Sequence, residues 1–282
     1  MYIGIDIGGT NTRIGLFPSL EQPDFTPMAR FSTSLQYGRQ LTLLRDALRD
    51  VEGCHGIGIS VGGRVTKDGQ AVSVAHNLRD YEGKPFIRDL AALVGCPAET
   101  LRLAHDPVCG LLAEQKFGSL RGSDRCVYLT LSTGTGAAFH LRSAAASITT
   151  SIEFGHQLLD GNERECICGQ VGCLETFTGG RQLEMRLGHS IAQISDQAFW
   201  NTFCDKLALG LVNLVQLTRV EVVAISGAIA LNNVFFLPLL QEKVAARLRG
   251  FTLAVMSAAL GEDAPLIGAV TLLAMPDGAI AH

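Results

Sequence analysis

The sequence has no long uninterrupted apolar run, no cationic leader segment and no run of lysine and arginine residues. Every apolar stretch is broken by glycine or a polar residue well before the roughly 20 residues that a membrane-spanning helix needs. Proteins that bind nucleic acid or anionic lipid gather positive charge to neutralise phosphates, whereas this chain has a formal net charge of −4. These absences predict a soluble, cytoplasmic protein that has neither nucleic acid nor a membrane among its partners.

Cysteine is sparse outside one short segment. Five of the eight cysteines are scattered singly, mostly within apolar stretches, and we interpret them as buried free thiols. They are Cys54, Cys96, Cys109, Cys126 and Cys204. A chain of 282 residues that is 47% hydrophobic can bury a substantial core without disulfide bonds.

The order of the expected elements is that of an α/β protein. Residues 1–17 alternate apolar positions around a glycine-containing centre, which predicts two strands joined by a tight turn, and residues 125–141 repeat this pattern. The repetition suggests an internal duplication. A loop carrying Pro23 and Pro27 is expected after the first hairpin. Apolar spacing predicts helices near 38–51, 85–95, 199–217, 237–248 and from 265 to just before 276, with a buried strand within 221–230. Because strands and helices interleave without a long linker, the fold class is α/β and any lobe boundary is a short hinge.

Two glycine turns suggest phosphate binding. "DIGGT" (Asp6 to Thr10) and "STGTG" (Ser132 to Gly136) place glycines, hydroxyls and backbone N–H groups where a bulky anion could approach. The chain lacks the motifs of a P-loop and of a dinucleotide-binding fold, so two ordinary hairpin turns are the alternative. Asp6 favours the phosphate interpretation, because a carboxylate within an apolar strand is costly to bury unless it meets a metal ion, water or a partner.

The segment "HQLLDGNERECICGQVGCLE" (residues 156–175) contains a possible metal site. His156, Cys166, Cys168 and Cys173 offer one imidazole and three thiolates, the ligand set of a closed tetrahedral zinc site. A redox pair is the alternative, but such a pair favours a two-residue gap between cysteines, which is missing here. With all four positions taken by protein, the zinc would be structural and would hold a loop in place.

Two carboxylates flank this segment. Glu153 precedes His156 in "EFGH", and Glu175 follows the last cysteine. Surface carboxylates are usually only solvated. Carboxylates held rigidly beside an imidazole suit recognition of the hydroxyls of a polyol, and this is the interpretation that we favour.

Together, "DIGGTNTR", "EFGH" and "CICGQVGCLE", in this order and spacing, resemble the ROK family of bacterial sugar kinases and related repressors. The resemblance covers nearly the whole chain. It implies a two-lobed actin-like ATPase (ribonuclease H-like) fold with a cleft between the lobes, ATP and Mg²⁺ as cofactors, a hexose substrate and commonly a homodimer. The smaller lobe would comprise residues 1–104 and a C-terminal helix 265–282, and the larger lobe, residues 105–264, would carry the zinc loop.

The resemblance also implies roles for individual residues. Asp106 matches the catalytic base, and Asp6 would lie near the magnesium ion. The nucleotide contacts implied are Gly8, Gly9, Thr10, Asn11, Arg13, Thr133, Gly134, Gly227 and Ala228. The sugar contacts implied are Gly62, Gly63, Asn77, His105, Asp106, Glu153, His156 and Glu175, with His156 serving zinc as well. Asp106 has an alternative interpretation as a favourable charge at a helix N-terminus beside Pro107.

The chain departs from the family pattern at several positions. His105 stands where asparagine is usual, Ser226 to Ala228 replace a run of three glycines, and "SAAASITTSI" before "EFGH" is poor in glycine. The segment between Glu175 and the helix near residue 199 is shorter than usual. We expect a hexokinase or glucokinase type of enzyme that phosphorylates a hexose, at the 6-position, with Asp106 as general base. The alternatives are a catalytically impaired sugar-binding protein and a sugar-responsive regulator, which would carry a helix-turn-helix segment before the first strand.

Overall fold

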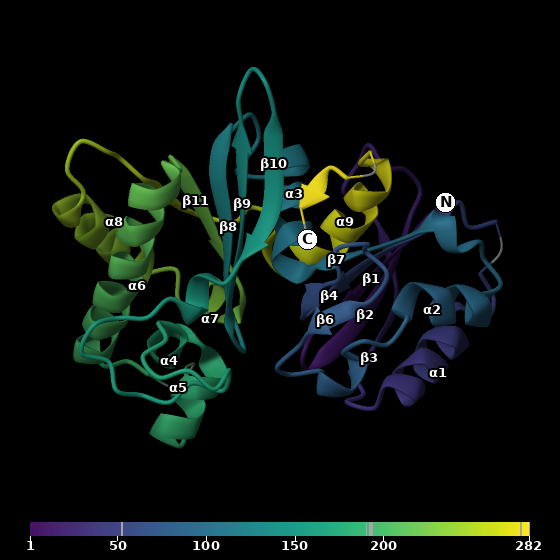
Figure 1. The fold of residues 1–282 in the computed structure, drawn as a ribbon, viewed down its shortest axis with the longest axis horizontal. Helices are drawn as coiled ribbons and strands as arrows, with labels where there is room; N and C mark the ends of the chain where they lie inside the picture. Colours follow the sequence, from purple (N-terminus) through teal and green to yellow (C-terminus); the bar gives the residue numbers. More distant parts are fainter. Residues whose placement is uncertain (52, 190, 192–193, 277, 282) are drawn as a thin grey trace. The chain divides into compact units, whose positions relative to one another are not determined.

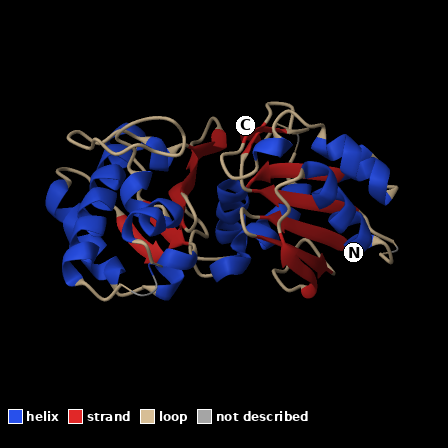
Figure 2. Ribbon diagram, turned by 90° about the horizontal axis from the view of Figure 1, so that it is seen from below, coloured by secondary structure: helices blue, strands red, loops and turns tan. Residues whose placement is uncertain are grey.

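A computed structural model describes residues 1–51, 53–189, 191, 194–276 and 278–281. The chain divides into two compact units, one comprising residues 1–113 and 263–282 and the other residues 114–262. The lobe boundaries expected from the sequence lie after residues 104 and 264. Figure 1 labels the elements, and Figure 2 distinguishes helices from strands.

The first unit is built on a five-stranded sheet. The strands are β1 (Tyr2–Ile7), β2 (Asn11–Phe17), β3 (Thr26–Ser32), β4 (Gly56–Val61) and β7 (Leu101–His105), in the order β3-β2-β1-β4-β7. A small two-stranded sheet joins β5 (Arg64–Val65) and β6 (Val72–Val74), and β13 (Ile280–Ala281) lies near the C-terminus. The helices are α1 (Tyr37–Leu48), α2 (Phe86–Val94), α9 (Ala264–Thr271) and the start of α3 (Asp106–Phe117).

Helices cover both faces of this sheet (Figures 1 and 2). Alternate residues of β1, Ile3, Ile5 and Ile7, are buried in one apolar cluster with residues of α1 and α2. The opposite face contacts α9, where a Cβ at Gly58 would lie 1.8 Å from the carbonyl oxygen of Ala269. Only glycine permits this close approach.

The register of the sheet places three strand ends side by side. β1 pairs in parallel with β4, and β4 pairs in parallel with β7, so that Ile7 lies beside Val61 and Val61 beside His105. The residues that follow these three strands therefore meet at one edge of the sheet. This edge carries the predicted site residues of the first unit.

The second unit has a mixed sheet with large helices. The strands are β8 (Arg125–Leu131), β9 (Thr135–Arg142), β10 (Ser147–Ile152), β11 (Val222–Ser226) and β12 (Ala254–Ser257), in the order β12-β11-β8-β9-β10. The helices are α4 (Glu175–Thr178), α5 (Gly180–Leu187), α6 (Gln197–Thr218), α7 (Ala228–Asn232) and α8 (Phe236–Arg247). Trp200 of α6 stacks on Phe236 of α8 with ring centroids 5.7 Å apart, and both belong to the apolar cluster that includes Val127 and Val223 of the sheet.

Both hairpins expected from the sequence form, β1 with β2 and β8 with β9. The expected loop around Pro27 was wrong, because residues 26–32 form β3. This strand lies at the edge of the sheet, where a neighbouring strand does not need the N–H group that proline lacks. The helix expected from apolar spacing, from 265 to just before 276, is confirmed, since α9 ends at Thr271 and a 3-10 turn continues to Ala274. The longer helix 265–282 given for the smaller lobe was wrong, because Pro276 follows this turn.

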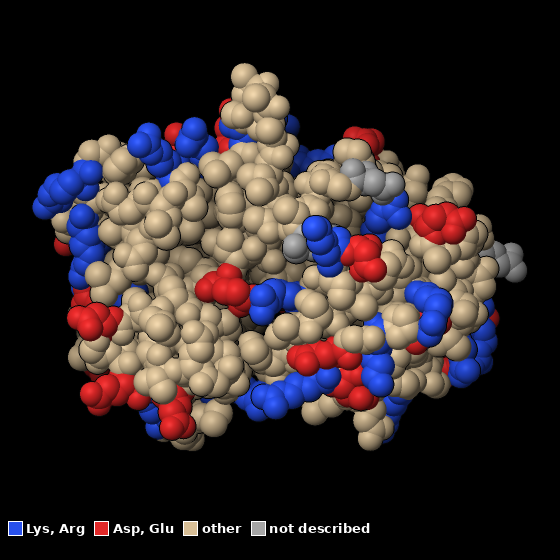
Figure 3. Space-filling view, viewed as in Figure 1, with Lys and Arg blue, Asp and Glu red and all other residues tan. Residues whose placement is uncertain are grey.

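Within the described ranges, no helix combines the length and apolar character needed to cross a membrane. Acidic and basic side chains are interspersed on the face drawn in Figure 3.

Candidate active site and metal centre

The first group of site residues lies at the edge where β1, β4 and β7 end. The first glycine turn closes with a hydrogen bond from Gly8 N to the carbonyl of Asn11 at 3.0 Å. Gly62 N donates to the carbonyl of Ile7 at 2.9 Å, and a Cβ at Gly9 would lie 3.4 Å from Asn77. The structure thus brings the first glycine turn, the turn at Gly62 and Asn77 together in one unit.

Asp6 has two partners in the same unit. Its Oδ1 accepts a hydrogen bond from Ser60 Oγ at 2.9 Å, and its Oδ2 accepts one from Arg13 at 2.9 Å. Arg13 also donates to Asp263 at 2.9 Å. The cost of burying the Asp6 carboxylate is therefore offset by a cation and a hydroxyl. A magnesium ion held by Asp6 would share the carboxylate with these donors, so the fit is less direct than that of the zinc ligands described below.

His105 and Asp106 follow directly from the end of β7. His105 Nε2 lies 3.2 Å from Asp106 Oδ1. Burial, and then the charge of Arg64, lower the pKa of His105 to about 3, so the imidazole is neutral. Its Nδ1 is buried and, in the part of the chain that is described, has no hydrogen-bond partner.

The surroundings of Asp106 disfavour a negative charge on its carboxyl group. Burial, and then the charge of Asp6, raise its pKa from 3.8 to about 8. About 31% of its side chain is still accessible to solvent. A carboxylate with a raised pKa that stays accessible is suited to accept a proton from a bound hydroxyl.

The second glycine turn lies in the other unit. Ser132 to Gly134 connect β8 to β9, and Ser132 N donates to the carbonyl of Gly134 at 3.0 Å. Gly227, directly after β11, has a φ of 89°, and a Cβ at this position would lie 2.4 Å from the carbonyl oxygen of Leu131. β11 and β8 are parallel neighbours, so the turns that follow them lie next to each other.

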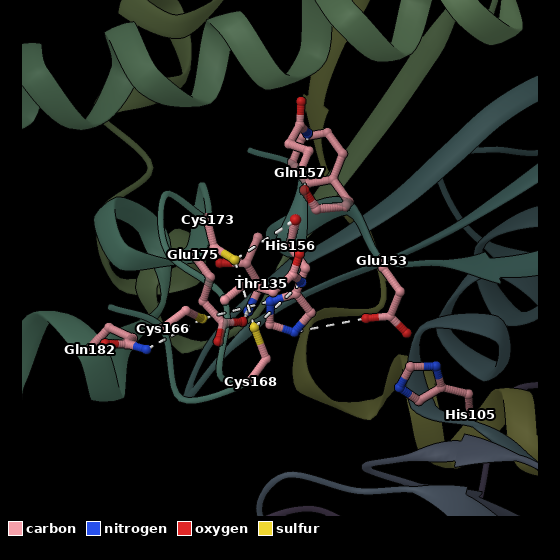
Figure 4. Close-up of polar contacts among 12 residues, drawn as sticks. His105, Thr135, Glu153, His156, Gln157, Cys166, Cys168, Cys173, Glu175 and Gln182 are labelled. Carbon is pink, nitrogen blue, oxygen red and sulfur yellow. Dashed lines mark hydrogen bonds and ion pairs between the residues drawn. The ribbon is translucent and has the colours of Figure 1, made fainter. Parts of the chain in front are cut away.

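Figure 4 shows the cluster of His156, Cys166, Cys168 and Cys173. Their four potential ligand atoms all lie within 4.8 Å of one another. His156 Nδ1 is 3.7 Å from Cys166 Sγ, and Cys168 Sγ is 3.7 Å from Cys173 Sγ. A tetrahedral zinc ion with bonds of about 2.3 Å to sulfur requires sulfur atoms about 3.8 Å apart, and the 3.7 Å between Cys168 and Cys173 matches this spacing.

The two glutamates near this cluster have different surroundings. Glu153 Oε2 lies 3.8 Å from Nε2 of His156, the ring nitrogen that does not face the cysteines, and its side chain is 43% exposed. Glu175 is 5% exposed, and its Oε2 accepts a hydrogen bond from the backbone N–H of Thr135 at 2.7 Å. Glu175 therefore contacts the second glycine turn as well as flanking the metal cluster.

Sequence reasoning missed several partners of these residues, namely Ser60, Asp263, Thr135 and Gln182. Thr135 lies inside the "STGTG" motif and carried a signal. Asp6 and Arg13 are direct cross-strand partners in the first hairpin, so the hairpin register could have predicted their ion pair. Nothing in the local sequence indicates Asp263, which lies 250 residues from Arg13.

The sequence is similar to those of known sugar kinases. The sequence model of the ROK family matches residues 2–275. An N-acetyl-D-glucosamine kinase of Salmonella heidelberg is 29% identical over 262 residues, which cover 82% of this chain and 84% of the relative. A glucokinase of Thermotoga maritima is 25% identical, with 96% of each chain covered.

A solved ROK family glucokinase from Streptomyces griseus, in complex with glucose and AMPPNP, has a similar structure. Its TM-score is 0.80 at 21% identity, covering 96% of this chain and 98% of the other. At this identity the likeness establishes the fold, which is the two-lobed actin-like ATPase fold that the family resemblance implied.

Proposed function

Because the chain belongs to the ROK family, we propose that it is an ATP-dependent sugar kinase that transfers the γ-phosphoryl group of ATP to the 6-hydroxyl of a hexose. The observation that carries the proposal is the position of Asp106. Its carboxyl group lies at the same edge of the sheet as the first glycine turn, in surroundings that raise its pKa toward neutrality. The kinases described above, one of them solved with glucose and an ATP analogue, support the same reaction class.

Asp106 acts as the general base. Phosphoryl transfer asks a protein to position the attacking hydroxyl, to neutralise charge on the phosphates and to accept one proton. The ionised Asp106 accepts the proton of the sugar hydroxyl as that oxygen attacks the γ-phosphorus and ADP leaves. His105 orients the carboxylate, since its Nε2 lies 3.2 Å from Asp106 Oδ1.

The two glycine turns bind the nucleotide. Gly8 to Asn11 and Thr133 to Gly134 present backbone N–H groups and hydroxyls to the phosphates, while Gly227 and Ala228 lie by the adenosine. Magnesium, when bound near Asp6, neutralises phosphate charge. Arg13 holds Asp6 in place through its ion pair.

The residues that we assign to sugar binding occur in each unit. In the first unit they are Gly62, Gly63, Asn77 and His105. In the second they are Glu153, His156 and Glu175, and a zinc ion bound by His156 and the three cysteines would keep their loop rigid.

A coupled assay of ADP release over a panel of hexoses and N-acetylhexosamines tests this function. We expect turnover that depends on both ATP and sugar, with the phosphate on the 6-hydroxyl as read by NMR of the product. Absence of sugar-dependent turnover across the panel, with sugar binding retained in calorimetry, would instead identify an impaired sugar-binding protein. Light scattering in the same buffer tests the homodimer that the family resemblance predicts.

A further inference from the structure

Glu175 joins the metal loop to the second glycine turn. It lies two residues after the last cysteine ligand, Cys173, and its Oε2 accepts the N–H of Thr135 at 2.7 Å. The carboxylate also fills the space beside the turn, since a Cβ at Gly134 would lie 2.9 Å from Glu175 Oε2. A hydrogen bond from a backbone N–H to a carboxylate is among the stronger ones in proteins. The position of Glu175 therefore fixes the end of the turn.

Helix α5 makes a second connection. The N–H groups of its first two residues, Gly180 and Arg181, donate to the carbonyl oxygens of Ser132 and Thr133 at 2.8 and 2.9 Å. The next residue, Gln182, donates from Nε2 to the sulfur of the first cysteine ligand at 3.5 Å (Figure 4). One helical turn thus contacts both the glycine turn and a ligand of the metal cluster.

Other hydrogen bonds link the start of the segment from Cys173 to Gln182 to the last cysteine ligand. Thr176 Oγ1 donates to the carbonyl of Cys173 at 2.8 Å, and Asn162 Nδ2 donates to the same carbonyl at 3.1 Å. Thr178 Oγ1 lies 2.8 Å from Thr135 Oγ1. The chain from Cys173 to Gln182 is therefore linked at one end to the metal ligands and along its length to the turn.

We propose that metal occupancy of the cluster sets the affinity of this chain for nucleotide phosphate, with Glu175 as the positioning residue. The inference rests on the proposed function, because it takes Ser132 to Gly134 as a phosphate-binding turn. The bound metal fixes Cys173 and thereby Glu175 and α5, so the turn is already ordered when the phosphate arrives. An ordered site binds more tightly because less conformational entropy is lost on binding. By linkage, nucleotide must strengthen metal binding by the same factor.

Zinc release tests this coupling without any turnover. Protein loaded with one equivalent of Zn²⁺ is mixed with an excess of a chromogenic chelator, with and without saturating ADP, in the absence of sugar. We expect ADP to slow zinc release and to strengthen zinc affinity about fivefold or more, the affinity being read from competition with the chelator at equilibrium, within the usual range of coupling between two sites. Equal zinc affinities with and without ADP, with ADP binding confirmed by calorimetry, would overturn the coupling and leave the proposed function intact. Failure of zinc-loaded protein to bind ADP would overturn both.

Two glutamines form a matched pair of variants. Gln182 and Gln170 each donate to a cysteine of the cluster, at 3.5 Å to Cys166 and at 3.6 Å to Cys168, but only Gln182 lies on α5. We expect both Q182L and Q170L to release zinc faster, because each loses a donor to a metal ligand. Only Q182L should weaken the effect of ADP on zinc release. An equal loss of the ADP effect in both variants would rule out the connection through α5.

Glu175 is tested at saturating zinc. E175A should weaken ADP binding about tenfold, as expected for loss of a buried hydrogen bond to a charged group. E175Q should retain most of the affinity, because an amide oxygen of the same shape can still accept the N–H of Thr135. Circular dichroism confirms that each variant is folded. ADP affinity unchanged in folded E175A would overturn the role of Glu175.

Discussion

His105 Nε2 lies 3.2 Å from Asp106 Oδ1, and the pair joins a neutral imidazole to a carboxyl group whose pKa is raised. When Asp106 is ionised it can only accept a hydrogen bond, so Nε2 must then carry the proton of the imidazole. The buried Nδ1 is consequently an acceptor. His105 can thus orient the base through Nε2, while its buried Nδ1 is an acceptor that has no hydrogen-bond partner among the described residues.

The rate of phosphoryl transfer should rise with pH because Asp106 must be ionised to act as a base. Its pKa is raised to about 8, so kcat/KM should increase between pH 6 and 8 and level off above that range. D106N should lose this dependence and about 10²- to 10⁴-fold in kcat, while sugar affinity is largely kept. The measurement is steady-state kinetics at saturating magnesium and zinc. A wild-type profile that stays flat over this range would contradict the assignment of Asp106 as base.

The free energy of unfolding should also depend on the ionisation of Asp106, but it should fall as pH rises. The pKa of Asp106 is higher in the folded chain than its usual value of 3.8, so the native state holds this proton more tightly than the unfolded state. Stability is therefore lost as pH rises from about 4 to about 8. D106N removes the effect, and its melting temperature relative to wild type should increase over this interval. D50N, at an exposed aspartate of the same unit, should follow wild type in parallel.

Much of the fold could be predicted from the sequence because its signals are local. Both hairpins and most helices follow from apolar periodicity and glycine turns within a few residues. β3 could not be predicted in this way, since Pro27 indicates a loop unless the strand is known to lie at the sheet edge.

The candidate site is predictable to a similar degree. Motif spacing located the metal cluster, whose four ligand atoms converge as expected. The contact of Glu175 with the second glycine turn could not be predicted, because it joins Glu175 to Thr135, 40 positions away along the chain. The same holds for Glu114, whose partners lie about 145 residues away.

Removal of zinc should destabilise the second unit. We expect one zinc ion per chain by elemental analysis and a melting temperature several degrees lower after chelation, restored by adding Zn²⁺. C168S should reproduce the effect, since it removes one of four ligands. C204S, at a buried cysteine outside the cluster, should keep the full zinc content. A chain purified with full activity and no bound metal would contradict the zinc assignment.

Glu114 should be among the most sensitive positions for stability. Its carboxylate is fully buried and accepts the N–H groups of Ser119, Ala259 and Leu260 at 2.7, 3.1 and 2.8 Å. E114A leaves these donors without partners and should cost roughly 3 kcal/mol or more of unfolding free energy. Urea denaturation measures the change, with E99A, at an exposed glutamate, as the control. A cost below about 1 kcal/mol would mean that water replaces the carboxylate.

Two variants in the turn after β11 should distinguish Gly227, which the backbone conformation requires, from Ala228, for which we propose only a contact with the nucleotide. Gly227 has a φ of 89° and a ψ of 160°, a region that essentially only glycine occupies. G227A also drives its Cβ to 2.4 Å from the carbonyl oxygen of Leu131, so this variant should lose stability and bind ATP more weakly. A228G restores the glycine usual in the family at the first position of α7 and should leave KM for ATP unchanged or lower it. If A228G instead raised KM for ATP several-fold with KM for sugar constant, the Ala228 methyl group would be a favourable contact of the nucleotide.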